Sequence, residues 1–217
     1  MVPMTEMEEK IEQGISEFYD RLAPDYDAMT GFEKRFAHER PFFRLLVERF
    51  GITTALDAGC GTGFHSLLLA RLGVDVTAVD VSRNMIDILQ RHAQEMQLSI
   101  HSVESTFLNL PEKLHSRYDA LFAMGNTLAH ILSHDELLGT LKIFRNLLKP
   151  SGLLFLQNLN YDRILARRDT VQSVKEHQGT TFVRYYEYAQ DAIQFHILKI
   201  EKIEGNLQHE LNTVTLR

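Results

Sequence analysis

Beyond residue 53, short runs of apolar residues alternate with segments in which apolar residues recur every three or four positions. The short runs have the length of buried strands, and the recurring pattern is that of amphipathic helices. Strands are predicted at 54–59, 74–82, 99–105, 118–125 and 153–159, and helices at 63–73, 83–96 and 133–152. This order predicts an α/β, Rossmann-like fold with a doubly wound, mostly parallel sheet and helices on both faces.

The two ends of the chain follow other patterns. Residues 5–50 have helical periodicity, which Pro24 and Gly31 interrupt. Residues 180–217 alternate with a period near two in three runs without an intervening helix, which predicts an antiparallel β meander. We therefore expect two parts, a core with an N-terminal helical segment over residues 1–162 and an antiparallel β cap over residues 163–217.

The composition narrows the class of partner. The 217 residues are 44% hydrophobic and 24% charged, as in ordinary globular domains, and the formal net charge of −6 argues against nucleic acid or an anionic membrane as partner. No apolar stretch has the length of a membrane span, and the acidic N-terminus lacks the pattern of a signal peptide, so we expect a cytoplasmic protein. Cys60 is the single cysteine and the ten histidines are scattered, so we expect no disulfide and no metal site.

A glycine-rich turn, GCGTG at 59–63, separates the first predicted strand from a helix. Such turns hold nucleotide-like ligands, and three candidates compete. A nucleoside triphosphate is disfavoured because no lysine follows the glycines, and a dinucleotide because G-x-G-x-G replaces G-x-G-x-x-G. Asp57, just before the turn, favours a ligand with a cationic group over a pyrophosphate.

A second carboxylate narrows the choice. Asp80 ends the second predicted strand, 21 positions after Gly59, where a carboxylate commonly accepts both hydroxyls of a ribose. The ligand is therefore expected to join an adenosine ribose to a zwitterionic part without a phosphate. S-adenosylmethionine fits this description, and S-adenosylhomocysteine would be its product.

The segments LDAGCGTG (56–63) and VTAVDVSRNMI (76–86) resemble motifs I and II of class I S-adenosylmethionine-dependent methyltransferases, and the resemblance extends over about residues 15–165. It implies that the glycine turn holds the methionine end of the cofactor. Thr106 stands where such proteins usually carry the Asp or Asn that caps the adenine amine, and Phe107 would flank adenine. The cofactor residues implied in this part of the chain are Asp57, Gly59, Cys60, Gly61, Asp80, Val81, Met85, Thr106, Phe107, Met124 and Gly125.

The segment FYDRLAPDYDAM (18–29) resembles the N-terminal helix and loop that closes over the cofactor in many small-molecule methyltransferases. The resemblance implies that Tyr19 and Tyr26 meet the methionine end of the cofactor and the substrate. Arg35 is a candidate partner for the carboxylate of the cofactor.

Two later segments, MGNTLAHI (124–131) and NYDRIL (160–165), resemble elements of glycine and sarcosine N-methyltransferases. The β-rich tail likewise resembles the sheet inserted in that group, where it covers the active site. The resemblance implies that Asn126 orients a substrate amine and that His130 acts as a base or orients a neighbour. It also places Asn158 and Tyr161 at the substrate.

Leu159 departs from that group. The glycine enzymes carry at this position an arginine that grips the carboxylate of the substrate, and leucine removes this bidentate partner. We therefore expect a neutral or differently charged small amine, or a natural-product scaffold, in place of glycine.

The predicted function is methyl transfer from S-adenosylmethionine to a small-molecule acceptor, in line and at an amine nitrogen. The alternatives are transfer to oxygen or carbon of a small metabolite, and a non-catalytic module that only binds S-adenosylmethionine. The family sheet normally ends with a helix and two further strands, which this sequence does not reach. Either the chain is truncated or the meander replaces the missing strands. In a truncated chain the edge of the fifth strand would be exposed, and a homodimer could cover it.

Overall fold

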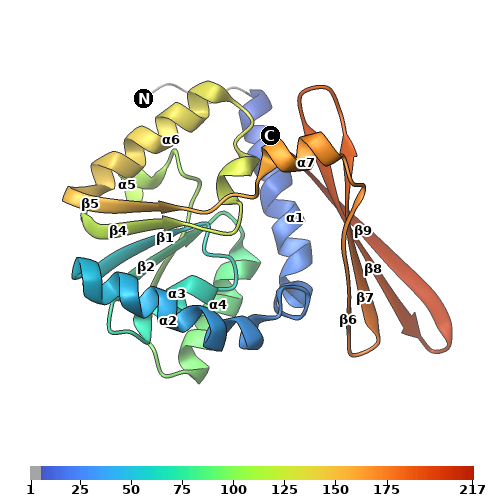
Figure 1. Cartoon of the computed structure of the whole chain (residues 1–217), viewed down its shortest axis with the longest axis horizontal. Coiled ribbons are helices and arrows are strands. Elements are labelled where there is room, and N and C mark those ends of the chain that lie inside the picture. Colours follow the sequence, from blue (N-terminus) through green and yellow to red (C-terminus); the bar gives the residue numbers. More distant parts are fainter. Residues whose placement is uncertain (1–5) are drawn as a thin grey trace.

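Five parallel strands form the central sheet of the computed structural model, which describes residues 6–217 (Figure 1). The strands follow the order β3-β2-β1-β4-β5, so the chain starts in the middle and winds out to both edges. Their bounds are β1 Thr54–Ala58, β2 Asp75–Asp80, β3 His101–Glu104, β4 Tyr118–Ala123 and β5 Leu148–Leu156. Residues 1–5, at the start of the acidic N-terminus, lie outside the described part.

Helices cover both faces of this sheet because its strands are apolar on both sides. One face packs against α2 (Phe32–Phe50), α3 (Phe64–Ala70) and α4 (Arg83–Glu95). The other packs against α5 (Leu110–Lys113) and α6 (His134–Leu147). The predicted doubly wound α/β fold is confirmed.

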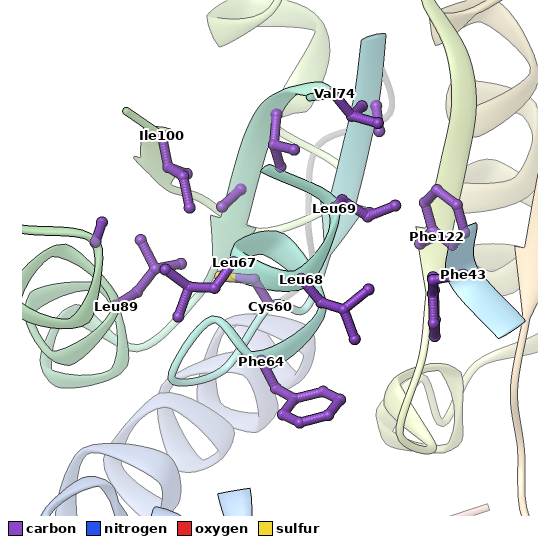
Figure 2. Close-up of a cluster of buried hydrophobic side chains, with 14 of the residues drawn as sticks. Phe43, Cys60, Phe64, Leu67, Leu68, Leu69, Val74, Leu89, Ile100 and Phe122 are labelled. Atoms are coloured by element: carbon purple, nitrogen blue, oxygen red, sulfur yellow. The ribbon is translucent and has the colours of Figure 1, made fainter. Parts of the chain in front are cut away.

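The first of these faces holds the larger hydrophobic core (Figure 2). Leu67, Leu68 and Leu69 of α3 are fully buried in it. Phe43 of α2 lies against Phe122 of β4, with the ring centroids 5.8 Å apart. This packing holds α3, and with it the turn that precedes α3, firmly on the sheet.

A separate antiparallel sheet follows the core and stands beside it in Figure 1. It is reached through the short helix α7 (Tyr161–Arg167). Its strands pair in the order β6-β7-β8-β9, with bounds β6 Val171–His177, β7 Thr180–Tyr188, β8 Ile193–Ile203 and β9 Asn206–Leu216.

Helix α1 (Glu6–Thr30) lies between the core and this second sheet. Phe18 and Leu22 are buried against the second sheet, where Phe182 of β7 meets them. Ala23 packs on the other side, in a small cluster with Met85 of α4. One helix therefore contacts both parts of the molecule.

The expected break at Pro24 is wrong. Pro24 lies inside α1, which continues to Thr30 and ends only at Gly31, where φ is +73°. Burial of α1 on both sides outweighs the local preference of proline to interrupt a helix.

The expected meander of three strands is likewise incomplete, because β6 adds a fourth. Its apolar residues, Val171 and Val174, are 56% and 62% exposed, so the strand carries no buried alternation by which its sequence could be recognised. Among the described residues, no helix is long and apolar enough to cross a membrane.

Candidate functional site

The glycine turn folds tightly at the carboxyl end of β1. The backbone N–H groups of Gly59 and Cys60 both donate to the carbonyl oxygen of Val79, at 2.8 and 2.9 Å. Gly59 has φ +76°, and a Cβ added there would lie 2.4 Å from the side chain of Thr127. Only glycine fits this position, so the turn can approach a ligand closely.

Asp80 sits beside the turn at the end of β2. Its Oδ2 accepts the N–H of Gly61 at 2.7 Å and its Oδ1 accepts the N–H of Ser82 at 3.0 Å. Burial raises the pKa of Asp80 to about 6, against the opposing effect of these two hydrogen bonds. The carboxylate is therefore fixed in orientation and mainly ionised at neutral pH.

A cavity of about 110 Å³ lies under α1 at the carboxyl ends of β1, β2 and β4. The hydroxyl oxygen of Thr106 is buried there without a hydrogen-bond partner, which suits the amine of an adenine. The residues predicted to bind the cofactor that line this cavity are Tyr19, Tyr26, Gly59, Gly61, Asp80, Val81, Thr106, Phe107, Met124 and Gly125. The residues present therefore fit an adenosine-containing ligand.

Four predicted cofactor residues do not line this cavity. Asp57 is buried and accepts a hydrogen bond from the hydroxyl of Ser66 at 2.6 Å. Arg35 pairs with Glu39 at 2.9 Å and places its guanidinium 4.1 Å from the ring centre of Phe64. The other two are buried in apolar clusters, and they are Cys60 and Met85. Direct contact of these four with the cofactor stays a prediction.

A second cavity, of about 590 Å³, opens between α1, α7 and the inner face of the antiparallel sheet. Asn126 and Asn158, both expected at the substrate, line it. Four residues line both cavities, and they are Tyr19, Tyr26, Gly125 and His130. The two cavities therefore meet at these side chains.

Tyr19 and His130 form a hydrogen-bonded pair at this junction. The Tyr19 hydroxyl lies 2.7 Å from Nε2 of His130, while Nδ1 of His130 is buried without a partner. Burial lowers the pKa of His130 to about 4 and raises that of Tyr19 well above its usual value. Both side chains are therefore neutral at pH 7.

Asn126 is held by contacts from three directions. Its backbone adopts the left-handed conformation, with φ +76°, and its N–H donates to the carbonyl of Gln157 at 2.9 Å. Its Oδ1 accepts the N–H of Leu159 at 3.1 Å, and its Nδ2 donates to the hydroxyl of Tyr161 at 2.7 Å. Tyr161 itself does not line the cavity, so the structure places it behind Asn126.

Sequence reasoning missed the contacts that tie α1 over the first cavity. Asp27 accepts the hydroxyl of Thr62 at 2.6 Å and pairs with Nε2 of His92 at 3.1 Å. About two turns earlier in α1, Asp20 accepts the hydroxyl of Ser82 at 2.6 Å. Acidic residues on an amphipathic helix look like a solvated face, so nothing in the sequence marked them.

A glycine turn, a carboxylate ending the next strand and a cavity at the carboxyl ends of parallel strands define a nucleoside-binding, Rossmann-like domain. The comparisons make the class specific, because residues 55–152 match the model of a family described as methyltransferase domain. The chain thus carries a methyltransferase domain of the S-adenosylmethionine-dependent type, and the resemblance and cofactor predicted from its sequence are confirmed.

Individual relatives agree with this. A glycine/sarcosine N-methyltransferase of Halorhodospira halochloris is 32% identical over 149 residues, which are 69% of this chain and 56% of the relative. The match spans a little over half the length of this relative and of two further glycine/sarcosine N-methyltransferases.

Solved structures share the fold over most of the chain. An S-adenosylmethionine-dependent methyltransferase from Clostridium acetobutylicum has a TM-score of 0.76 at 16% identity, covering 92% of this chain and 81% of the other. The CcbJ methyltransferase from Streptomyces caelestis has a TM-score of 0.72 at 25% identity, covering 92% and 80%.

Proposed function

We propose that the chain transfers the methyl group of S-adenosylmethionine to an amine nitrogen of a small molecule. The observation that carries the proposal is the Tyr19–His130 pair, which stands where the cofactor cavity meets a second, larger cavity. The names of the curated relatives, which are glycine/sarcosine N-methyltransferases, support a small amine as the acceptor.

In this proposal residues 1–162 form the cofactor-binding core with α1 as its lid, and residues 163–217 form the cap over the acceptor. The glycine turn holds the methionine end of the cofactor and Asp80 accepts the ribose hydroxyls, with its ionised form required. Thr106 and Phe107 flank the adenine, because both line the same cavity.

S-adenosylmethionine supplies a methyl group on a sulfonium, which is a strong electrophile by itself. What remains for the protein is to align the acceptor nitrogen and to exclude water. Tyr19 and Asn126 serve this purpose, because both reach the acceptor cavity and both are held by hydrogen bonds. We assign them contact with the acceptor amine.

His130 has a different role. Its pKa of about 4 makes it a weak base, too weak to draw a proton from an ammonium group efficiently. When Nε2 accepts the Tyr19 O–H, the lone pairs of the Tyr19 oxygen are left to accept an N–H of the amine. That contact aims the nitrogen lone pair at the methyl carbon, so His130 is a positioning residue.

The test combines calorimetry with a methyl-transfer screen across small amines and alcohols, the products being identified by mass. S-adenosylmethionine should bind, and transfer should occur to nitrogen. His130→Ala should lower kcat with little change in the affinity for the cofactor, and His130→Gln, whose Oε1 can accept the Tyr19 proton, should restore part of it. Failure to bind S-adenosylmethionine, or transfer to hydroxyl oxygen alone, would contradict the proposal.

The pH profile separates positioning from base catalysis. If His130 acts only on Tyr19, no ionisation of this histidine shapes kcat between pH 6 and 9, because it is already neutral there. A fall in kcat on the acid side of the profile that disappears in His130→Gln would instead assign this histidine the role of base.

A further inference from the structure

Arg184 occupies an unusual position on the inner face of the antiparallel sheet. Every second residue of β7 points to the same side of the sheet, and this side carries Phe182, Arg184 and Tyr186. Phe182 and Tyr186 are buried there against α1. Arg184 lies between these two aromatic residues and lines the large acceptor cavity. A guanidinium in such apolar surroundings costs free energy unless a partner compensates for the lost water.

The protein supplies only part of that compensation. The Nε of Arg184 donates to the hydroxyl of Ser173, its cross-strand neighbour on β6, at 2.7 Å. Among the side chains that the structure describes, no carboxylate forms an ion pair with Arg184. The two terminal nitrogens of the guanidinium are left to bind something else, and they can hold two oxygens at once.

The charged residues that line the cavity are mostly positive, like Arg184. Three arginines line it, Arg163, Arg167 and Arg184, against the single carboxylate of Asp169. Arg167 already pairs with Asp169 at 3.3 Å. No carboxylate among the side chains that the structure describes forms an ion pair with the other two arginines.

A nearby lysine responds to this charge. Lys175 of β6 donates from Nζ to the carbonyl of Met29, and its pKa is lowered by burial first and by Arg184 second. Arg35 lowers the pKa of Lys175 in the same direction, so this lysine faces two positive neighbours. An anion bound at Arg184 would compensate the charge of the guanidinium and would favour the charged form of Lys175.

We propose that the methyl acceptor carries an anionic group, a carboxylate or a phosphate, and that Arg184 binds it. This rests on the proposed function, because the cavity is an acceptor site only if the chain transfers a methyl group. The cavity volume of about 590 Å³ leaves room for an acceptor larger than glycine. Leu159 therefore does not exclude an anionic acceptor, because Arg184 supplies a guanidinium from another element.

The test uses matched pairs of acceptors that differ only in the anionic group, glucosamine against glucosamine 6-phosphate and 4-aminobutanol against 4-aminobutanoate. The wild-type chain should show a KM at least about tenfold lower for one anionic member than for its neutral partner, since charge-assisted hydrogen bonds are the stronger ones. If the KM difference appears only in the glucosamine pair, the site binds a phosphate. If it appears only in the 4-aminobutanol pair, the site binds a carboxylate.

Arg184→Gln should raise the KM of the anionic acceptor by about 10- to 100-fold and leave that of its neutral partner and kcat nearly unchanged. Arg145→Gln removes the same charge from an exposed position of α6 that does not line the cavity, and it is the control. Equal use of neutral and anionic acceptors, or an equal effect of Arg184→Gln on both, would overturn the proposal.

A binding measurement separates this proposal from the proposed function. Inorganic phosphate and acetate are titrated into the chain saturated with S-adenosylhomocysteine, and the wild type should bind one of them while Arg184→Gln binds it at least about tenfold more weakly. Anion binding of this kind without methyl transfer to any acceptor would leave the anion site standing and contradict the proposed reaction. No binding to the wild type, or equal binding to Arg184→Gln, would refute the anion site itself.

Discussion

We expect the carboxylate of Asp80 to make the affinity for the cofactor depend on pH. Burial raises its pKa to about 6, and a ribose needs the ionised form because only that form accepts from both hydroxyls. A group whose pKa is raised in this way loses its charge as the pH falls, so the cofactor must bind more weakly in acid.

The size of the effect follows from the ionised fraction. With a pKa of about 6, roughly 90% of the carboxylates are ionised at pH 7 and roughly 10% at pH 5. The apparent dissociation constant of S-adenosylmethionine should therefore rise about tenfold, which corresponds to about 1.4 kcal/mol. The α-ammonium and α-carboxylate groups of a free amino acid both keep their charge in this interval, so they do not produce the slope.

Calorimetry with S-adenosylmethionine from pH 5.0 to 7.5 measures this dependence. Asp80→Asn should bind more weakly at pH 7 and show no such slope, because its amide does not titrate. His92 also carries a raised pKa and is present in both proteins, so its contribution cancels in the comparison. A wild-type affinity that stays flat down to pH 5, or an equal slope in Asp80→Asn, would refute the placement of the ribose at Asp80.

Three further changes have defined outcomes. Gly59→Ala should lower the free energy of unfolding by about 2 kcal/mol or more in thermal denaturation, because the residue is left-handed and its Cβ would meet Thr127. Thr106→Val should leave the melting temperature unchanged or higher, since its hydroxyl has no partner, yet weaken cofactor binding several-fold; unchanged calorimetric affinity would count against its adenine contact. The hydrogen bond to Asp27 raises the pKa of His92 above its usual 6.5, so this tie is present below pH 6.5 and is lost as the pH rises through the folded pKa. Amide hydrogen exchange of α1, corrected for its intrinsic rate, should therefore increase above that pH in the wild type but not in Asp27→Asn. Identical exchange profiles in the two proteins would show that the Asp27–His92 pair does not hold α1.

Much of the fold was predictable because its strands are buried on both faces and separated by amphipathic helices. The fourth strand of the second sheet was not, since Val171 and Val174 are exposed and give no alternation toward a core. The break predicted at Pro24 was wrong because burial of α1 outweighs the tendency of proline to interrupt a helix.

The candidate cofactor cavity could be predicted to the extent that its lining depends on backbone constraints. Gly59 and Asp80 carry local patterns with a physical cause, and both line the cavity. Arg35 and Met85 were placed by likeness alone, and their contact with the cofactor stays a prediction. Folding brings Arg35 over the ring of Phe64 and buries Met85 in an apolar cluster with Ala23, and neither contact could be read from the sequence. Arg184 lay within a strand of aromatic residues, and its face could not be known before the sheet was docked on α1.

The position of α1 has a consequence for the order of events. Tyr19 and Tyr26 of this helix are walls of both cavities, and the opposite sides of the helix pack on α4 and on the antiparallel sheet. If α1 moves away so that S-adenosylmethionine can enter, Tyr19 and Tyr26 also leave the acceptor cavity. The binding site for the acceptor amine is then incomplete. We therefore expect compulsory sequential kinetics, with S-adenosylmethionine entering before the acceptor and S-adenosylhomocysteine leaving after the methylated product.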